Sequence, residues 1–121
     1  MRAKELVERL TVLGFTASSA RLYLAGLKTG PSLIAPLARE AGISRKSAYP
    51  LLEELGRRGF FLQKQVGKRT HYQAVSAKQL LKIVLNQEQL VRELLPFLDT
   101  MTASEQPRAK ANIDTPLPFK L

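Results

Sequence analysis

The chain has 121 residues, enough for one compact domain with an extension, and it contains no cysteine, which excludes disulfides and thiolate metal sites. Its formal net charge is +9, and residues 45–75, with seven Lys or Arg and two Glu, are the most basic part. Such a charge favours polyanionic partners, nucleic acid first and anionic lipid second. No apolar run is long enough for a membrane span or a signal peptide, so we expect a cytoplasmic protein.

Three helices are predicted in the first part of the chain, each from apolar residues at three- and four-residue spacing. The first covers residues 2–13 and ends at Gly14. The second begins after Thr16, whose hydroxyl can accept from a free amide of the first turn, and it ends at Gly30. The third is short and ends at Gly42, a residue suited to the positive φ of a tight turn.

A fourth helix is predicted over residues 45–58, with Ser44 as its cap and an apolar stripe along one side. Together with the short helix before it, this segment predicts a helix-turn-helix. Pro50 cannot donate to the carbonyl of Lys46, and the residue before a proline, here Tyr49, is biased away from α geometry. We therefore predict a slight kink or a tightened first turn, with a harmless irregularity on an exposed face as the alternative.

A β-hairpin is predicted over residues 61–74, because polar and apolar residues alternate on both sides of the turn sequence GKR. Its tip is basic, with Lys64, Lys68 and Arg69 close together. An ordinary solvated turn would carry such charges as well. Their coincidence with a basic capped helix favours the functional interpretation.

A long helix is predicted from Ser76, because six residues follow alternating steps of four and three: Leu80, Val84, Gln87, Val91, Leu94 and Leu98. This seam must be buried against a neighbour, and a second copy of the chain offers a matching seam, so we expect a homodimer through these residues. Pro96 is expected to kink or end the helix. Residues 103–121, which hold three prolines, are expected to form a flexible tail.

The order of these elements is that of a winged helix-turn-helix, a mainly α fold with a small β-hairpin. In this arrangement the first turns of the capped helix enter the major groove, and the hairpin lies along the backbone or an adjacent minor groove. Tyr49 has an alternative role as a partly buried packing residue. Arg57 and Arg58 are left out of the site because the C-terminus of a helix favours cations in any case. The candidate DNA-binding residues are Ser44, Arg45, Lys46, Ser47, Tyr49, Lys64, Lys68 and Arg69.

Three segments carry a resemblance to known regulators: LGFTASSARLYLAGLKTGP, LAREAGISRKSAYPLLEELGRRGFF and GKRTHYQAV. Together they resemble the DNA-binding domain of TrmB-type transcriptional regulators, and the piece YPLLEEL is similar to the recognition helix of PadR-type regulators. The resemblance implies sequence-specific binding of double-stranded DNA as a dimer, through a winged helix-turn-helix at 1–76 that is followed by a dimerisation helix at 77–102. TrmB-type regulators commonly continue into an effector-binding domain, for which residues 103–121 are too short. Sugar sensing is therefore not implied, and the effector stays unspecified.

Neither an enzyme, a metal site nor a cofactor is predicted. Glu53 and Glu54 are neighbours on a helix and point apart, and His71 is the only histidine. A rival function is that of a protein-interaction module without specific DNA binding, since winged helices also serve as docking surfaces. Attachment to an anionic membrane is disfavoured, because no helix combines a basic face with bulky aromatic anchors.

Overall fold

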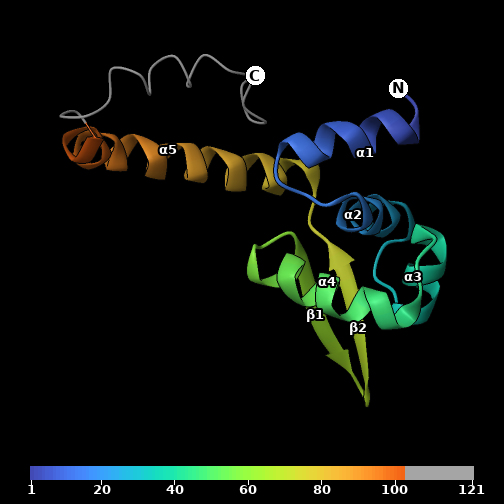
Figure 1. Cartoon of the computed structure of the whole chain (residues 1–121). Helices are drawn as coiled ribbons and strands as arrows, with labels where there is room; N and C mark the ends of the chain where they lie inside the picture. Colours follow the sequence, from blue (N-terminus) through green and yellow to red (C-terminus); the bar gives the residue numbers. More distant parts are fainter. Residues whose placement is uncertain (103–121) are drawn as a thin grey trace. The chain divides into compact units, whose positions relative to one another are not determined.

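The computed structural model describes residues 1–102, so the predicted tail at 103–121 lies outside the described residues. A first compact unit comprises residues 1–80, and a second begins at Leu81. The described chain is mainly helical with one antiparallel hairpin, as the sequence predicted. Its elements are α1 (Ala3–Val12), α2 (Ala17–Thr29), α3 (Ile34–Ala41), α4 (Arg45–Arg57), β1 (Phe61–Val66), β2 (Arg69–Ala74) and α5 (Ala77–Thr102) (Figure 1).

Side-chain caps start three of these helices; the sequence predicted the caps at Thr16 and Ser44, and for Ser76 only the start of a helix. The hydroxyl of Thr16 accepts a hydrogen bond from the amide of Ser19 at 3.0 Å, and the Ser19 hydroxyl accepts one from the amide of Thr16 at 2.9 Å. The hydroxyl of Ser44 accepts from the amide of Ser47 at 3.0 Å, and that of Ser76 accepts from the amide of Gln79 at 3.1 Å. Each cap satisfies an amide that has no partner inside its own helix.

The hydrophobic core of the first unit gathers around α2. This helix packs against α1, α3, α4 and β2, and in Figure 1 it lies between α1 on one side and the hairpin with α4 on the other. The ring of Phe15 stands 5.8 Å from that of Tyr23 and 4.8 Å from that of Phe60, centroid to centroid. The largest fully buried side chains are Tyr23, Phe60, Leu22, Leu37, Leu52 and Leu55.

Gly26 lets α2 approach the hairpin closely. A Cβ atom at this position would stand 2.7 Å from the ring of Phe61 and 2.8 Å from the Cβ of Ala74. Both distances are shorter than side chains tolerate, so the missing side chain is what allows the helix to lie on the strands. A glycine inside a helix costs about 1 kcal/mol relative to alanine, and here the close packing offsets that cost.

The hairpin is joined to the rest of the first unit by more than its own two strands. Phe61 of β1 pairs with Ala74 of β2, and Val66 pairs with Arg69 at the turn. On the other edge of β2, Ser32 and Tyr72 exchange two backbone hydrogen bonds of 3.0 and 2.8 Å. The segment between α2 and α3 therefore holds the base of the hairpin against the helix-turn-helix.

Replacing Tyr23 with phenylalanine is expected to lower the free energy of unfolding by about 1–3 kcal/mol, because the Tyr23 hydroxyl donates a buried 2.8 Å hydrogen bond to the carbonyl of Val75. Burial also raises the pKa of Tyr23. The neutral phenol therefore stabilises the fold fully below the unfolded-state pKa of about 10, and this stabilisation is lost as the pH rises through the higher folded-state pKa.

Urea unfolding of wild type and variant at pH 7 and above pH 10 measures both effects, and the difference between the two proteins is expected to shrink at the higher pH. The exposed Tyr49, replaced in the same way, is the matched control and is expected to change stability by less than about 0.5 kcal/mol. Equal effects of the two changes would contradict the buried hydrogen bond.

The helix α5 runs without interruption from Ala77 to Thr102. The expected end of the helix at Pro96 was wrong, because the helix continues for six more residues. Pro96 still cannot donate a hydrogen bond to the carbonyl of Arg92. One turn earlier, the Arg92 side chain forms an ion pair with Glu88 at 2.8 Å. Among residues 1–102, no helix is long and apolar enough to cross a membrane.

Candidate nucleic-acid interface

The first turn of α4 combines a polar cap with exposed cations. The Ser44 hydroxyl also donates to the Ser47 hydroxyl at 2.9 Å, which fixes the entry to the helix. The guanidinium of Arg45 donates a long hydrogen bond of 3.4 Å to the hydroxyl of Tyr49 one turn later. Since Arg45 and Lys46 are both exposed, this turn presents two positive charges beside the free amides of a helix N-terminus.

The helix α4 passes through Pro50 without a break, and Tyr49 keeps its place inside the helix. Pro50 therefore does not end α4, and the slight kink or tightened first turn that the sequence favours there stays a prediction. Tyr49 is 47% exposed, so about half of its surface is buried, and both the base contact and the partly buried packing role stay predictions. Its ring and hydroxyl are accessible on the same side of the helix as Arg45.

A groove of about 540 Å³ brings α4 and the hairpin turn together. Four predicted site residues line it, Arg45 and Tyr49 from α4 and Lys68 and Arg69 from the turn of the hairpin. We call this hollow the basic groove. Its remaining lining consists of Leu33, Ile34, Ala35, Thr70 and Tyr72.

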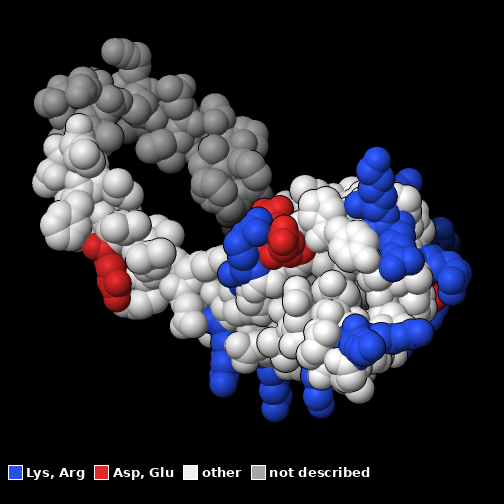
Figure 2. Space-filling model, turned by 90° about the horizontal axis from the view of Figure 1, so that it is seen from below, with Lys and Arg blue, Asp and Glu red and all other residues white. Residues whose placement is uncertain are grey.

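The other four predicted residues lie outside the lining of the basic groove. Ser44, Lys46 and Ser47 are exposed at the first turn of α4. Lys64 is exposed on β1, where it pairs with His71 of β2. Figure 2 views the molecule from the side toward which the hairpin tip points in Figure 1, and it shows Lys and Arg side chains across much of the first unit with few acidic ones among them.

A second hollow, of about 420 Å³, shares Tyr49 and Tyr72 with the basic groove and was not predicted. We call it the Glu53 hollow, and it is lined by Tyr49, Pro50, Glu53, Gln63 and Tyr72. Burial raises the pKa of Tyr72, with smaller contributions from Tyr49 and Glu53, so the phenol stays neutral at pH 7. The sequence held one signal for this hollow: Lys46, Pro50, Glu53 and Arg57 follow helical spacing along the outer side of α4.

Arg58 has a structural role that the sequence did not reveal. Its guanidinium lies 4.9 Å from the ring centre of Phe60 and 5.5 Å from that of Phe15, and it donates a 3.1 Å hydrogen bond to the carbonyl of Gly14. These contacts tie the end of α4 to the loop between α1 and α2. This placement agrees with the prediction that Arg58 is not one of the DNA-binding residues.

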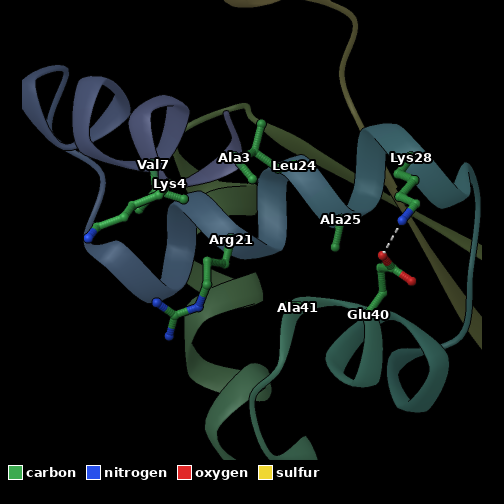
Figure 3. Close-up of a pocket in the computed structure, with 9 residues that line it drawn as sticks. All are labelled: Ala3, Lys4, Val7, Arg21, Leu24, Ala25, Lys28, Glu40 and Ala41. Atoms are coloured by element: carbon green, nitrogen blue, oxygen red, sulfur yellow. Dashed lines mark ion pairs between the residues drawn. The ribbon is translucent and has the colours of Figure 1, made fainter. Parts of the chain in front are cut away.

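A third hollow, of about 410 Å³, lies between α1, α2 and α3 (Figure 3). Its lining is mostly small and apolar, and the amine of Lys28 pairs with the carboxylate of Glu40 at 2.9 Å. Figure 3 shows that the charged ends of Lys4 and Arg21 lie away from this ion pair. Polar groups therefore do not converge there as they do in a ligand site. In the part of the chain that the structure describes, no three His, Cys, Asp or Glu residues gather as a metal site would require.

Comparison with known proteins places this arrangement among DNA-binding regulators. Residues 10–78 match the family described as "Sugar-specific transcriptional regulator TrmB". The HTH-type sugar sensing transcriptional regulator TrmBL1 of Pyrococcus furiosus is 35% identical over 60 residues, which are 50% of this chain and 18% of that protein. The structure of TrmBL2, an archaeal chromatin protein with a novel mode of DNA binding, is similar with a TM-score of 0.70 and 24% identity, over 91% of this chain and 45% of that one.

A regulator of the MarR family from Silicibacter pomeroyi has a similar fold as well, with a TM-score of 0.56 and 14% identity over 92% of this chain and 73% of that one. These likenesses support the winged-helix fold. The chain spans less than a fifth of TrmBL1 and less than half of TrmBL2. The family and these relatives are regulators and DNA-binding proteins rather than enzymes, which agrees with the expectation from the sequence.

Proposed function

Because the chain belongs to the TrmB family of transcriptional regulators, we propose that it binds double-stranded DNA sequence-specifically and acts as a homodimer. In this proposal α4 enters the major groove, and the hairpin lies along the backbone or in an adjacent minor groove. The observation that carries it is the basic groove, where Arg45 of α4 and Lys68 and Arg69 of the hairpin turn surround one hollow. A single DNA duplex can touch both elements only if they share a side in this way.

The two elements have different roles in the proposal. Arg45 and Lys46 lie in the first turn of α4, where long cationic side chains reach base edges and so select sequence. Lys68 and Arg69 are exposed at the hairpin turn, where they meet phosphates and contribute affinity without selecting sequence. Ser44 and Ser47 hold the first turn in shape, since their hydrogen bonds fix the start of the helix.

Replacing Lys68 and Arg69 together with alanine is expected to weaken binding to all duplexes to a similar degree. Each phosphate contact contributes about 0.9 to the slope of log K against log salt concentration, so the slope should fall by up to about two. Titrations at four or more salt concentrations measure it. Replacing Lys4 and Arg9 of α1 with alanine removes the same charge from exposed positions outside the basic groove, and an equal fall in slope there would contradict the contacts at the hairpin.

The exposed apolar residues of α5 are the basis for proposing a dimer. The predicted seam runs along this helix, and its members Val91 and Leu94 are 53% and 42% exposed. Leu81, Leu85 and Leu90 add further apolar surface. A helix this apolar is not stable in water unless a neighbour covers it, and the alternating steps of four and three residues are typical of helices that pair with a matching seam. A second copy supplies that seam.

One experiment tests recognition and assembly together: selection of bound sequences from random duplex DNA, with a mass measurement in solution. We expect an enriched inverted repeat, with half-sites about one helical turn apart or a multiple of it, and a particle of twice the mass of one chain. A single chain with no enriched sequence would contradict both parts. In that case the apolar α5 would favour the rival function, a protein-interaction module that uses this helix for docking.

A further inference from the structure

Two hollows of opposite character lie where α4 meets the hairpin, and both are lined in part by Tyr49 and Tyr72. The basic groove carries Arg45, Lys68 and Arg69. The Glu53 hollow carries a carboxylate and no cation. Neutralisation of phosphates explains the cations of the basic groove but not a hollow whose only charged lining residue is Glu53.

Glu53 lies on the outer stripe of α4. Lys46, Pro50 and Glu53 follow one another at steps of four and three residues, so they point in nearly the same direction, and all three are exposed. Among the described residues, no hydrogen bond or ion pair engages the Glu53 carboxylate. This carboxylate is therefore free to accept hydrogen bonds from a partner that approaches α4 from outside.

A free carboxylate on this stripe is unfavourable beside DNA unless it meets a hydrogen-bond donor. The phosphates repel it, and α4 gains no affinity from it. In the major groove, however, the N4 amino group of cytosine is a donor, and glutamate is a side chain that accepts from it. A misplaced carboxylate thus weakens binding to most sequences and is tolerated only where a cytosine compensates for it.

We propose that Glu53 determines specificity by accepting a hydrogen bond from the N4 amino group of a cytosine in the major groove. This inference rests on the proposed function, because it requires α4 to enter that groove. Gln63 and Tyr72 form the polar wall of the Glu53 hollow on the hairpin side. Pro50, one turn before Glu53, presents an apolar ring that suits the methyl group of a neighbouring thymine.

The test compares Glu53→Gln with Glu54→Gln on the duplex that wild type selects. Glu54 is exposed on the same helix but does not line the Glu53 hollow, so the second variant removes the same charge elsewhere. Each cytosine of the selected site is replaced by thymine in turn, with adenine opposite. We expect wild type and Glu54→Gln to lose about 5-fold to 150-fold in affinity at one such position, corresponding to one base contact.

Glu53→Gln is expected to lose this discrimination at that one position and to keep it elsewhere, because a glutamine amide can donate to thymine as well as accept from cytosine. If both variants raise affinity for every duplex alike and keep the same preferences, Glu53 only repels phosphate and the inference is overturned. A wild type with no preference at all would overturn the proposed function too. Urea unfolding of both variants, expected within about 0.5 kcal/mol of wild type, verifies that the fold is intact.

Discussion

Replacing Phe60 with alanine is expected to lower the free energy of unfolding by about 3–5 kcal/mol, as is typical of a buried aromatic ring that leaves a cavity. Phe60 is 2% exposed, and its ring packs near that of Phe15 and the guanidinium of Arg58. The carbonyl of Phe60 also accepts a hydrogen bond from the amide of Val75 at 3.0 Å, and the amide of Phe60 donates one to the carbonyl of Leu55 at 2.8 Å. The ring therefore sits where α4, the hairpin and the loop after α1 meet.

The size of this loss matters because small domains unfold at a cost of only about 5–15 kcal/mol. Urea unfolding followed by circular dichroism measures it. The matched control is Leu62→Ala, two residues further along, where the side chain is 56% exposed and a change within about 0.5 kcal/mol is expected. Equal losses for the two variants would contradict the placement of Phe60 in the core.

Replacing Arg45 and Lys46 together with alanine is expected to remove most of the sequence preference. A good base contact contributes about 1–3 kcal/mol of discrimination, so the loss of two lowers the ratio of specific to unrelated binding by a factor of about 30 to 20,000. Binding to unrelated duplexes weakens as well, since two positive charges are gone, but it weakens less. Competition between the selected duplex and a scrambled one measures the ratio.

The control for that variant removes the same charge from α1 by replacing Lys4 and Arg9 with alanine, both of which are exposed and lie outside the basic groove. This control is expected to keep the ratio and to lower both affinities slightly. If the ratio of specific to unrelated binding is unchanged in the Arg45 and Lys46 variant, base recognition does not come from the first turn of α4. The comparison with Glu53→Gln then shows whether it comes from the third turn.

Local chemistry explains why so much of the fold was predicted. Thr16, Ser44 and Ser76 cap helices through hydrogen bonds that span three residues, and Gly42 takes the positive φ of 77° that ends α3. A turn, a cap or an alternation depends on near neighbours in the chain, so its signal is complete within a short window. The basic character of α4 and of the hairpin turn could be read in the same way.

Proline shows the limit of such local signals. Pro96 was expected to kink or end α5, and it does not end the helix, which continues to Thr102. Pro50 lies within α4 as well, and a slight kink at either proline stays a prediction. A proline removes one hydrogen bond, whereas the many bonds on either side keep their geometry. The alternation in β1 predicted the strand correctly but did not reveal how little of it is buried: Leu62 and Val66 are exposed, and of the six residues of β1 only Phe61 is buried among the described residues.

The sequence by itself determined the order of the elements, their caps and turns, and the concentration of positive charge in α4 and the hairpin turn, because each of these depends on residues close together in the chain. Only the tertiary structure decided that Gly26 lets the hairpin pack closely on α2, that Arg58 lies on two aromatic rings, and that Tyr49 lines both the basic groove and the Glu53 hollow. These features join residues that are far apart in the chain, and their contacts depend on how the helices and strands pack, which no local pattern specifies.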